Sequence, residues 1–87
     1  MKREDVYLLI DGEREYQDLR WNAETTLSEG KHTPEEWFFY IEDYIREAKH
    51  ILSRNPIPAC YPLAMGIMRK VAAMAVCAME QNGAPRR

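Results

Sequence analysis

The longest apolar stretch of the chain covers residues 62–81 and reads PLAMGIMRKVAAMAVCAMEQ. As a helix it is apolar over well more than half of its circumference, and such a helix needs neighbours on most sides. The chain has 87 residues, near the lower end of sizes that fold without disulfides or metals. Two further short helices cannot surround this segment completely. We therefore expect a second subunit or a short fourth element to cover it, and we favour a homo-oligomer.

Apolar periodicity predicts two more helices, separated by the polar segment NAETTLSEGKH, residues 22–32. The expected helices span residues 4–21, 34–53 and 62–81. The sequence contains no strand pattern and no internal repeat. These features predict one all-α domain over residues 1–87: a three-helix, or four-element, antiparallel bundle completed by oligomerisation.

The ends of the predicted helices carry recognisable signals. In HTPEEW, Thr33 is the expected N-cap, Pro34 the first helical residue, and Glu36 can complete a capping box. The segment SRNPIPACYP contains three prolines, which end this helix and force an extended connection. NGAP ends the last helix, with Gly83 as its C-terminal cap.

Composition and charge exclude several classes of function. The chain is 46% hydrophobic and 30% charged, which is typical of a globular protein. A formal net charge of -2, with no basic stripe, argues against binding to DNA, RNA or an anionic membrane. A membrane span over residues 62–81 would bury Arg69 and Lys70, so a soluble helix is favoured.

Two further features indicate a cytoplasmic protein. The first five residues carry four charges, unlike a secretory signal peptide. Cys60 and Cys77 flank or lie in one helix and are too far apart along it to form a disulfide within the chain. A reduced environment is therefore expected.

The stretch GEREYQDLRW continues the apolar face of the first helix with polar side chains. That face begins with Val6, Leu9 and Ile10, which should point toward a core. It then continues through Glu13, Gln17 and Arg20. A carboxylate that faces inward needs a partner. One interpretation is an internal ion pair of Glu13 with Arg69 or Lys70, and the other is a carboxylate and an amide presented to a ligand or metal.

Acidic side chains follow one ridge of the helix over residues 34–53. Glu36, Asp43 and Glu47 recur at helical spacings and repel one another unless a cation is near. Rows of oxygen ligands suit Mg²⁺, held partly through water and substrate phosphate. The alternative is a solvated face neutralised by neighbouring basic residues.

Four kinds of side chain are candidates for contacts to a nucleotide. Lys70 lies at the edge of an apolar arc, where it either extends into water or contacts phosphate. His32 precedes a helix N-terminus that can attract anions, although a loop histidine needs no such role. Trp21 can stack on a base, while Arg20 or Arg69 can bind phosphate.

Three segments, EREYQDLRW, HTPEEW and MRKVAAMAVCAMEQNGAP, resemble small phage and prophage proteins related to the dATP/dGTP pyrophosphohydrolases, near the MazG-like all-α nucleotide pyrophosphohydrolases. In such chains a glutamate and a glutamine four residues apart precede a tryptophan. A histidine and a glutamate lie around the start of the next helix, and a lysine lies near the start of a late alanine-rich helix. The matching residues are Glu13, Gln17, Trp21, His32, Glu36 and Lys70.

This resemblance implies Mg²⁺-dependent hydrolysis of nucleoside triphosphates to the monophosphate and pyrophosphate. Metal-bound water would attack phosphorus while the metal neutralises charge on the phosphate oxygens. Glu13 and Glu36 would be catalytic residues and metal ligands, and Asp43 a further ligand. Arg69 or Lys70 would contact the phosphates. Oligomerisation is typical of that group and would cover the apolar last helix.

The sequence lacks both paired-acid motifs of that family, E-E-x-x-E and E-x-x-D. A non-catalytic alternative therefore stays open: a protein that sequesters a nucleotide, or one that binds a host protein through its helices. The three consecutive aromatic residues 38–40 spread over about 200° of a helix. We expect Phe39 to point toward solvent or a second chain, and we place it with Met68 and Met79 in an interface.

Overall fold

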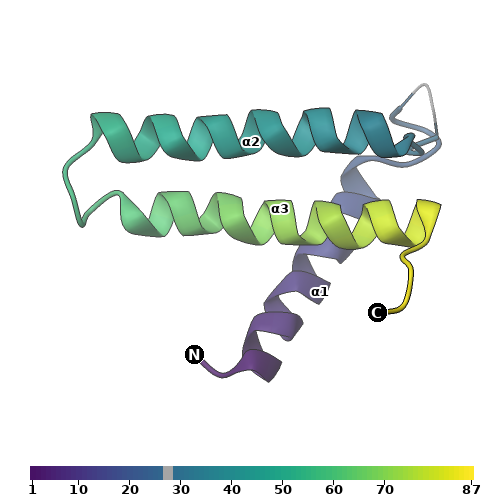
Figure 1. Ribbon diagram of the computed structural model, residues 1–87, viewed down its shortest axis with the longest axis horizontal. Helices are drawn as coiled ribbons and strands as arrows, with labels where there is room; N and C mark the ends of the chain where they lie inside the picture. The colour runs from purple at the N-terminus through teal and green to yellow at the C-terminus, as the bar shows by residue number, and fades with distance from the viewer. Residues whose placement is uncertain (27–28) are drawn as a thin grey trace.

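The computed structural model describes residues 1–26 and 29–87, and within them it contains three helices (Figure 1). They are α1 (Arg3–Arg20), α2 (Pro34–Arg54) and α3 (Tyr61–Asn82). The predicted all-α, three-helix fold is confirmed. Every predicted helix end lies within one residue of the observed one. Leu27 and Ser28, in the predicted loop, lie outside the described residues.

Helix α3 is the centre of the arrangement. Helices α2 and α3 run antiparallel, side by side, and α1 crosses α3 obliquely (Figure 1). Helix α1 packs against α3 only, and its N-terminal half extends away from the α2–α3 pair. One helix therefore provides the packing surface for both of the others.

The predicted caps of α2 and α3 are confirmed. The Oγ1 atom of Thr33 accepts a hydrogen bond from the backbone N–H of Glu36 at 3.3 Å, and Oε1 of Glu36 accepts one from the backbone N–H of Thr33 at 3.0 Å. This is the reciprocal capping box. At the other end of the chain, Gly83 has a φ of 79° and donates its N–H to the carbonyl of Met79 at 2.7 Å.

The capping box predicts an acid-dependent loss of stability. The backbone N–H of Thr33, followed by its side chain, lowers the pKa of Glu36 from its ordinary value of 4.5. A carboxyl group whose pKa is lower in the folded than in the unfolded state stabilises the fold at pH values above its unfolded-state pKa. This stabilisation is lost as the pH falls through its folded-state pKa. We expect the melting temperature of Glu36→Gln to lie below that of wild type at pH 7, and the gap to narrow at pH 3. Glu35→Gln is the control. A difference in melting temperature between Glu36→Gln and wild type that is the same at pH 3 and pH 7 would contradict this role of Glu36.

The buried side chains lie mostly along α3. They are Gln17, Trp37, Cys60, Ala64, Ile67, Ala73 and Met74. All but Gln17 are apolar or carry a thiol. Ala73 is fully buried, with 0% of its surface exposed. It lies one helical turn from Arg69, whose side chain contacts α1, so a small residue sits on the face of α3 that α1 crosses.

The expectation that the apolar start of α1 faces a core is wrong for the single chain. Val6 and Leu9 are 39% and 46% exposed, whereas Gln17 is only 4% exposed. The reason is the crossing geometry, because α1 meets α3 with its C-terminal half (Figure 1). Of the polar part of this face, Glu13 and Gln17 point inward as expected, whereas Arg20 is exposed and that expectation is wrong for the single chain.

Helix α3 is also long and apolar enough to cross a membrane by length and composition alone, with a mean hydropathy of 1.4 over its best window. The core helix of a soluble protein satisfies the same criterion. In this fold α3 packs against both other helices, and its Arg69 is paired with Glu13. The cytoplasmic location stays a prediction.

Candidate functional site: an aromatic cavity beside the helix crossing

Two inward polar residues of α1 fasten it to α3. Oε1 of Glu13 accepts a hydrogen bond from Nε of Arg69 at 2.8 Å. The side chain of Glu13 is 9% exposed and that of Arg69 is 50% exposed. Nε2 of Gln17 donates to the carbonyl of Lys70 at 3.2 Å. The internal ion pair, one of the two interpretations of the polar stripe, is thus formed.

Arg14 is a further residue at the crossing, and sequence reasoning missed it. Its Nε lies 2.7 Å from Oε1 of Glu80, and its Nη2 lies 2.9 Å from Oδ1 of Asp18. Burial disfavours the charged form, but the hydrogen bonds with Glu80 and Asp18 outweigh it and raise the pKa of Arg14. Arg14 and Asp18 are spaced so that they pair along one helix, and this pair could be predicted from the sequence. Glu80 lies far from Arg14 along the chain, so their contact could not be predicted in this way.

A cavity of about 320 Å³ opens beside this crossing. It lies between the end of α1, the segment before α2, and the facing sides of α2 and α3. Five of its lining residues carry aromatic rings: Trp21, His32, Trp37, Tyr40 and Tyr44. The others are Arg14, Gln17, Asp18, Thr26, Gly30, Met74 and Cys77. A mostly aromatic wall with few polar groups is typical of small-molecule sites.

His32 provides an unpartnered polar atom in the cavity wall. Its Nδ1 is buried and has no hydrogen-bond partner among the described residues, and Oε2 of Glu36 lies 3.7 Å away. The imidazole contacts the rings of Trp37 and Tyr40 edge-on, with centroids 5.2 and 5.0 Å apart. Buried polar atoms normally have a partner, so this nitrogen retains an unused capacity for one hydrogen bond.

Gln81 holds the walls of the cavity together. Its Oε1 accepts hydrogen bonds from Nε1 of Trp37 at 2.9 Å and from the backbone N–H of His32 at 3.0 Å. Its Nε2 donates to the carbonyl of Gly30 at 2.8 Å. One side chain at the end of α3 therefore positions α2 and the preceding segment. These partners are 44 to 51 residues away along the chain, so no local pattern could reveal them.

The cavity brings together only part of the predicted ligand-binding set. Gln17, Trp21 and His32 line it. Three other predicted residues do not line the cavity and contact other groups. Arg20 lies 5.9 Å from the ring of Trp21, Nζ of Lys70 lies 4.7 Å from the ring of Tyr44, and Arg69 is paired with Glu13. Lys70 thus contacts the ring of Tyr44, which lines the cavity, but does not line the cavity itself.

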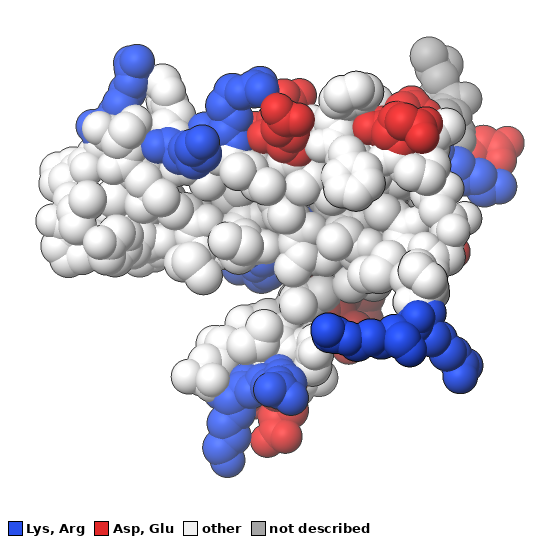
Figure 2. Space-filling model, in the orientation of Figure 1, with Lys and Arg blue, Asp and Glu red and all other residues white. Residues whose placement is uncertain are grey.

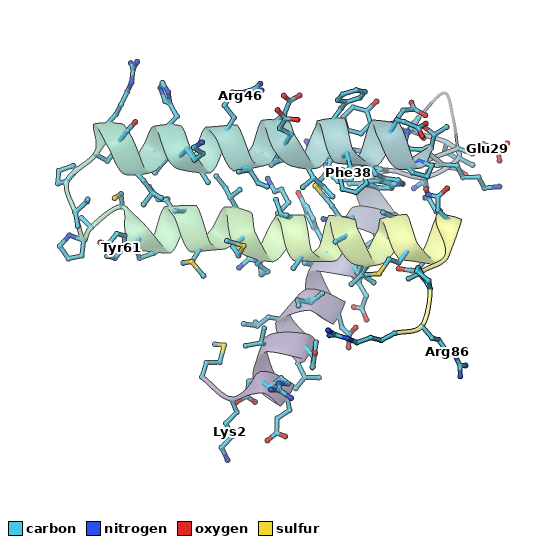
Figure 3. The ribbon with its side chains drawn as sticks, in the orientation of Figure 1. Lys2, Glu29, Phe38, Arg46, Tyr61 and Arg86 are labelled. Carbon is cyan, nitrogen blue, oxygen red and sulfur yellow. The ribbon has the colours of Figure 1, made fainter. Side chains whose placement is uncertain are left out.

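The predicted Mg²⁺ ligands lie apart. Glu13 is at the helix crossing, Glu36 is in the capping box, and Asp43 pairs with Arg46 at 3.0 Å. Figure 3 shows Arg46 on the side of α2 that faces away from α3. Within residues 1–26 and 29–87, no three His, Cys, Asp or Glu side chains are grouped so that they could hold a metal ion. The predicted magnesium site is therefore not assembled by these described residues of a single chain.

The described residues that line the cavity offer phosphate no unpaired cation. Arg14 is the one lysine or arginine among the described residues that line the cavity, and both Asp18 and Glu80 bind it. Burial also raises the pKa of the Cys77 thiol, so this lining residue adds no negative charge at pH 7. The cavity therefore suits an uncharged planar group better than an anion.

Comparison of the chain with protein families, curated proteins and solved structures finds no match. The resemblance to the MazG-like pyrophosphohydrolases stays a prediction that rests on its short motifs. The function is accordingly inferred from the cavity and the contacts around it.

The Glu13–Arg69 pair predicts a measurable loss of stability. Glu13 is nearly buried and Arg69 is half exposed. We therefore expect the contribution of this pair to stability to lie between that of a surface ion pair and that of a buried one. We expect Glu13→Gln to lower the free energy of unfolding by about 1–2 kcal/mol in urea denaturation. Glu42→Gln removes an exposed pair with Arg46 and should change it by less than about 0.5 kcal/mol. Equal, small effects of both substitutions would contradict a structural role for Glu13.

Proposed function

We propose that the protein is a binding module for a small planar ligand, and that the ligand is the base or nucleoside part of a nucleotide. The observation that carries this proposal is the cavity with five aromatic rings and the unpartnered Nδ1 of His32. Aromatic side chains stack on any nucleobase, because every base has a π-face. The imidazole nitrogen adds one directional hydrogen bond.

The size and polarity of the cavity support a ligand of this class. A volume of about 320 Å³ is at the lower end of the range for small-molecule sites, about 300–1,000 Å³. Such sites combine apolar walls with a few polar groups that fix orientation. Gln17 and His32 supply these groups here, and the rings of Trp37 and Tyr40 provide stacking surfaces.

The charges support recognition of the base over the phosphates. Arg14 is already bound to Asp18 and Glu80, so a phosphate at this position would compete with two carboxylates. We therefore expect a nucleoside to bind at least as tightly as its triphosphate. Magnesium should not be required, since Glu13 and Asp43 are each paired with an arginine.

Thermal unfolding with a panel of nucleosides and nucleoside triphosphates, with and without Mg²⁺, tests this proposal. A nucleoside at 100 times its Kd would stabilise the folded state by about 2.7 kcal/mol. We expect such a shift without Mg²⁺ and without release of pyrophosphate. A shift that requires both triphosphate and Mg²⁺, together with pyrophosphate release, would instead support the hydrolase that the resemblance implies.

A matched pair of aromatic substitutions locates the binding. Tyr40 lines the cavity, whereas Phe39 is its neighbour in α2, is 66% exposed and does not line it. Stacking of a base on an aromatic side chain contributes about 1–3 kcal/mol. We expect Tyr40→Ala to raise the Kd of the nucleoside about 10- to 100-fold in a calorimetric titration, and Phe39→Ala to leave it unchanged. Equal losses in both variants would place the ligand elsewhere.

A further inference from the structure

One side of α3 exposes large apolar side chains. It carries residues spaced alternately by three and four positions: Met65, Met68, Ala72, Ala75 and Met79. We call these five residues the α3 stripe. Its three methionines are 60%, 57% and 48% exposed, in chain order, and its two alanines are half-buried. A repeat of 3.5 residues is the pattern by which one helix packs along another.

The stripe is separate from the faces of α3 that the other helices use. Arg69 and Glu80 mark the side toward α1, because they contact Glu13 and Arg14. Ile67 and Met74 are buried on the side toward α2. At 100° per residue, the centre of the stripe lies about 90° from the side marked by Arg69 and Glu80, and about 130° from the side marked by Ile67 and Met74. It is thus a third face of α3.

The single chain exposes more surface than its mass requires. Its accessible surface is 7093 Å² for a mass of 10.2 kDa. A compact monomer of this mass exposes about 5,300 Å². The difference, roughly 1,800 Å², exceeds the approximately 800 Å² that each partner contributes to a standard interface. This excess is shared between the open face of α3 and the N-terminal half of α1, which extends away from the helix pair, and it is large enough to include an interface of standard size.

The order of residues in the stripe makes it complementary to itself. Met68 and Met79 lie equally far from the midpoint between Ala72 and Ala75. In an antiparallel pair of α3 helices, each Ala72 would oppose Ala75 of the second copy, and each Met68 would oppose Met79. The alanines permit close approach at the centre, and the methionines fill the space on either side. Such self-complementarity is what a twofold interface requires.

Charge also favours this pairing. Figure 2 shows charged side chains gathered along the outer edge of α2 and on α1, while the surface over α3 in that view is largely uncharged. Arg69 and Glu80 are the charged residues of α3 nearest the stripe, and Glu13 and Arg14 compensate them. Two copies could therefore meet without bringing unpaired like charges together.

We propose that two copies of this chain form a homodimer in which their α3 stripes pack antiparallel about a twofold axis between Ala72 and Ala75. The dimer covers the apolar side of α3 that the other two helices leave open. This inference does not depend on the ligand of the aromatic cavity, because the stripe contains no residue that lines it.

The mass of the purified full chain in solution, measured by sedimentation equilibrium, tests the dimer. We expect about twice the chain mass of 10.2 kDa at tens of micromolar protein. Met68→Glu should reduce the mass to that of one chain, or weaken association at least 100-fold. Leu63→Glu is the matched control, because Leu63 is 61% exposed on the opposite side of α3, and it should remain dimeric. A monomeric wild type, including one that binds lipid vesicles or another protein instead, would overturn the proposal.

Cysteine cross-linking tests the direction of pairing and does not require a destabilising charge. Two tagged variants, Ala72→Cys and Ala75→Cys, are mixed, allowed to exchange subunits and oxidised mildly. Disulfides form only between cysteines whose Cα atoms lie within about 7 Å. We expect cross-links between unlike variants, as in an antiparallel pair. Cross-links only between like variants, or none beyond those of the wild-type protein, would contradict the arrangement.

Discussion

Trp37→Ala is expected to lower the free energy of unfolding by about 3–5 kcal/mol, the largest effect of a single truncation in this fold. Trp37 is 7% exposed and is the largest side chain in a small core. Its Nε1 also donates to Gln81, whose Oε1 would then lose one of its two partners. Domains of this size have total stabilities of about 5–15 kcal/mol, so the variant would be close to unfolding.

Urea denaturation followed by circular dichroism measures this effect. Phe38→Ala is the control, because Phe38 neighbours Trp37 in α2 but is 73% exposed. We expect Phe38→Ala to change the free energy of unfolding by less than about 0.5–1 kcal/mol. Similar losses in the two variants would mean that Phe38 is buried in solution, as it would be by a partner chain on that side of α2.

Gly30→Ala is expected to destabilise the fold by at least about 2 kcal/mol and to weaken ligand binding. Gly30 has a φ of 75°, a left-handed conformation that costs other residues about 1–3 kcal/mol. An added Cβ would lie 2.8 Å from the carbonyl oxygen of Trp21, so the backbone must shift as well. Both residues line the cavity, and a displaced segment would change its shape.

Gly12→Ala provides a control of opposite sign. Gly12 lies within α1, and a Cβ there would meet nothing within 4 Å. Alanine in place of a helical glycine should stabilise the fold by up to about 1 kcal/mol. If Gly30→Ala were instead neutral in the same denaturation experiment, the close approach of Gly30 to Trp21 would not persist in solution.

The helices themselves could be predicted closely from the sequence. The capping box at Thr33 and Glu36, the proline-rich connection and Gly83 are local signals, and local signals determine where helices begin and end. The crossing of α1 over α3 is not local. Val6 and Leu9 therefore carried the pattern of core residues although they are exposed in the single chain. Their periodicity predicts an apolar face but does not say which molecule covers it.

The candidate site could be predicted only in part. Glu13 and Gln17 interrupt an apolar face with polar side chains, which predicts contacts with a neighbouring helix, and both contact α3. Arg14 and Gln81 were missed, since each acts through partners far along the chain. Trp21 and His32 were singled out as ligand contacts, and both line the cavity. The roles of these residues in nucleotide binding stay predictions.

The two tryptophans offer the most direct test of the proposed function. The chain contains only Trp21 and Trp37, and both line the cavity, so their indole N–H signals in a nitrogen-15 correlation spectrum report on its occupancy. Titration with purine and pyrimidine nucleosides, without metal, should shift both signals along saturable curves. Tryptophan signals that stay unchanged up to millimolar concentrations of every nucleoside would contradict a base-binding cavity.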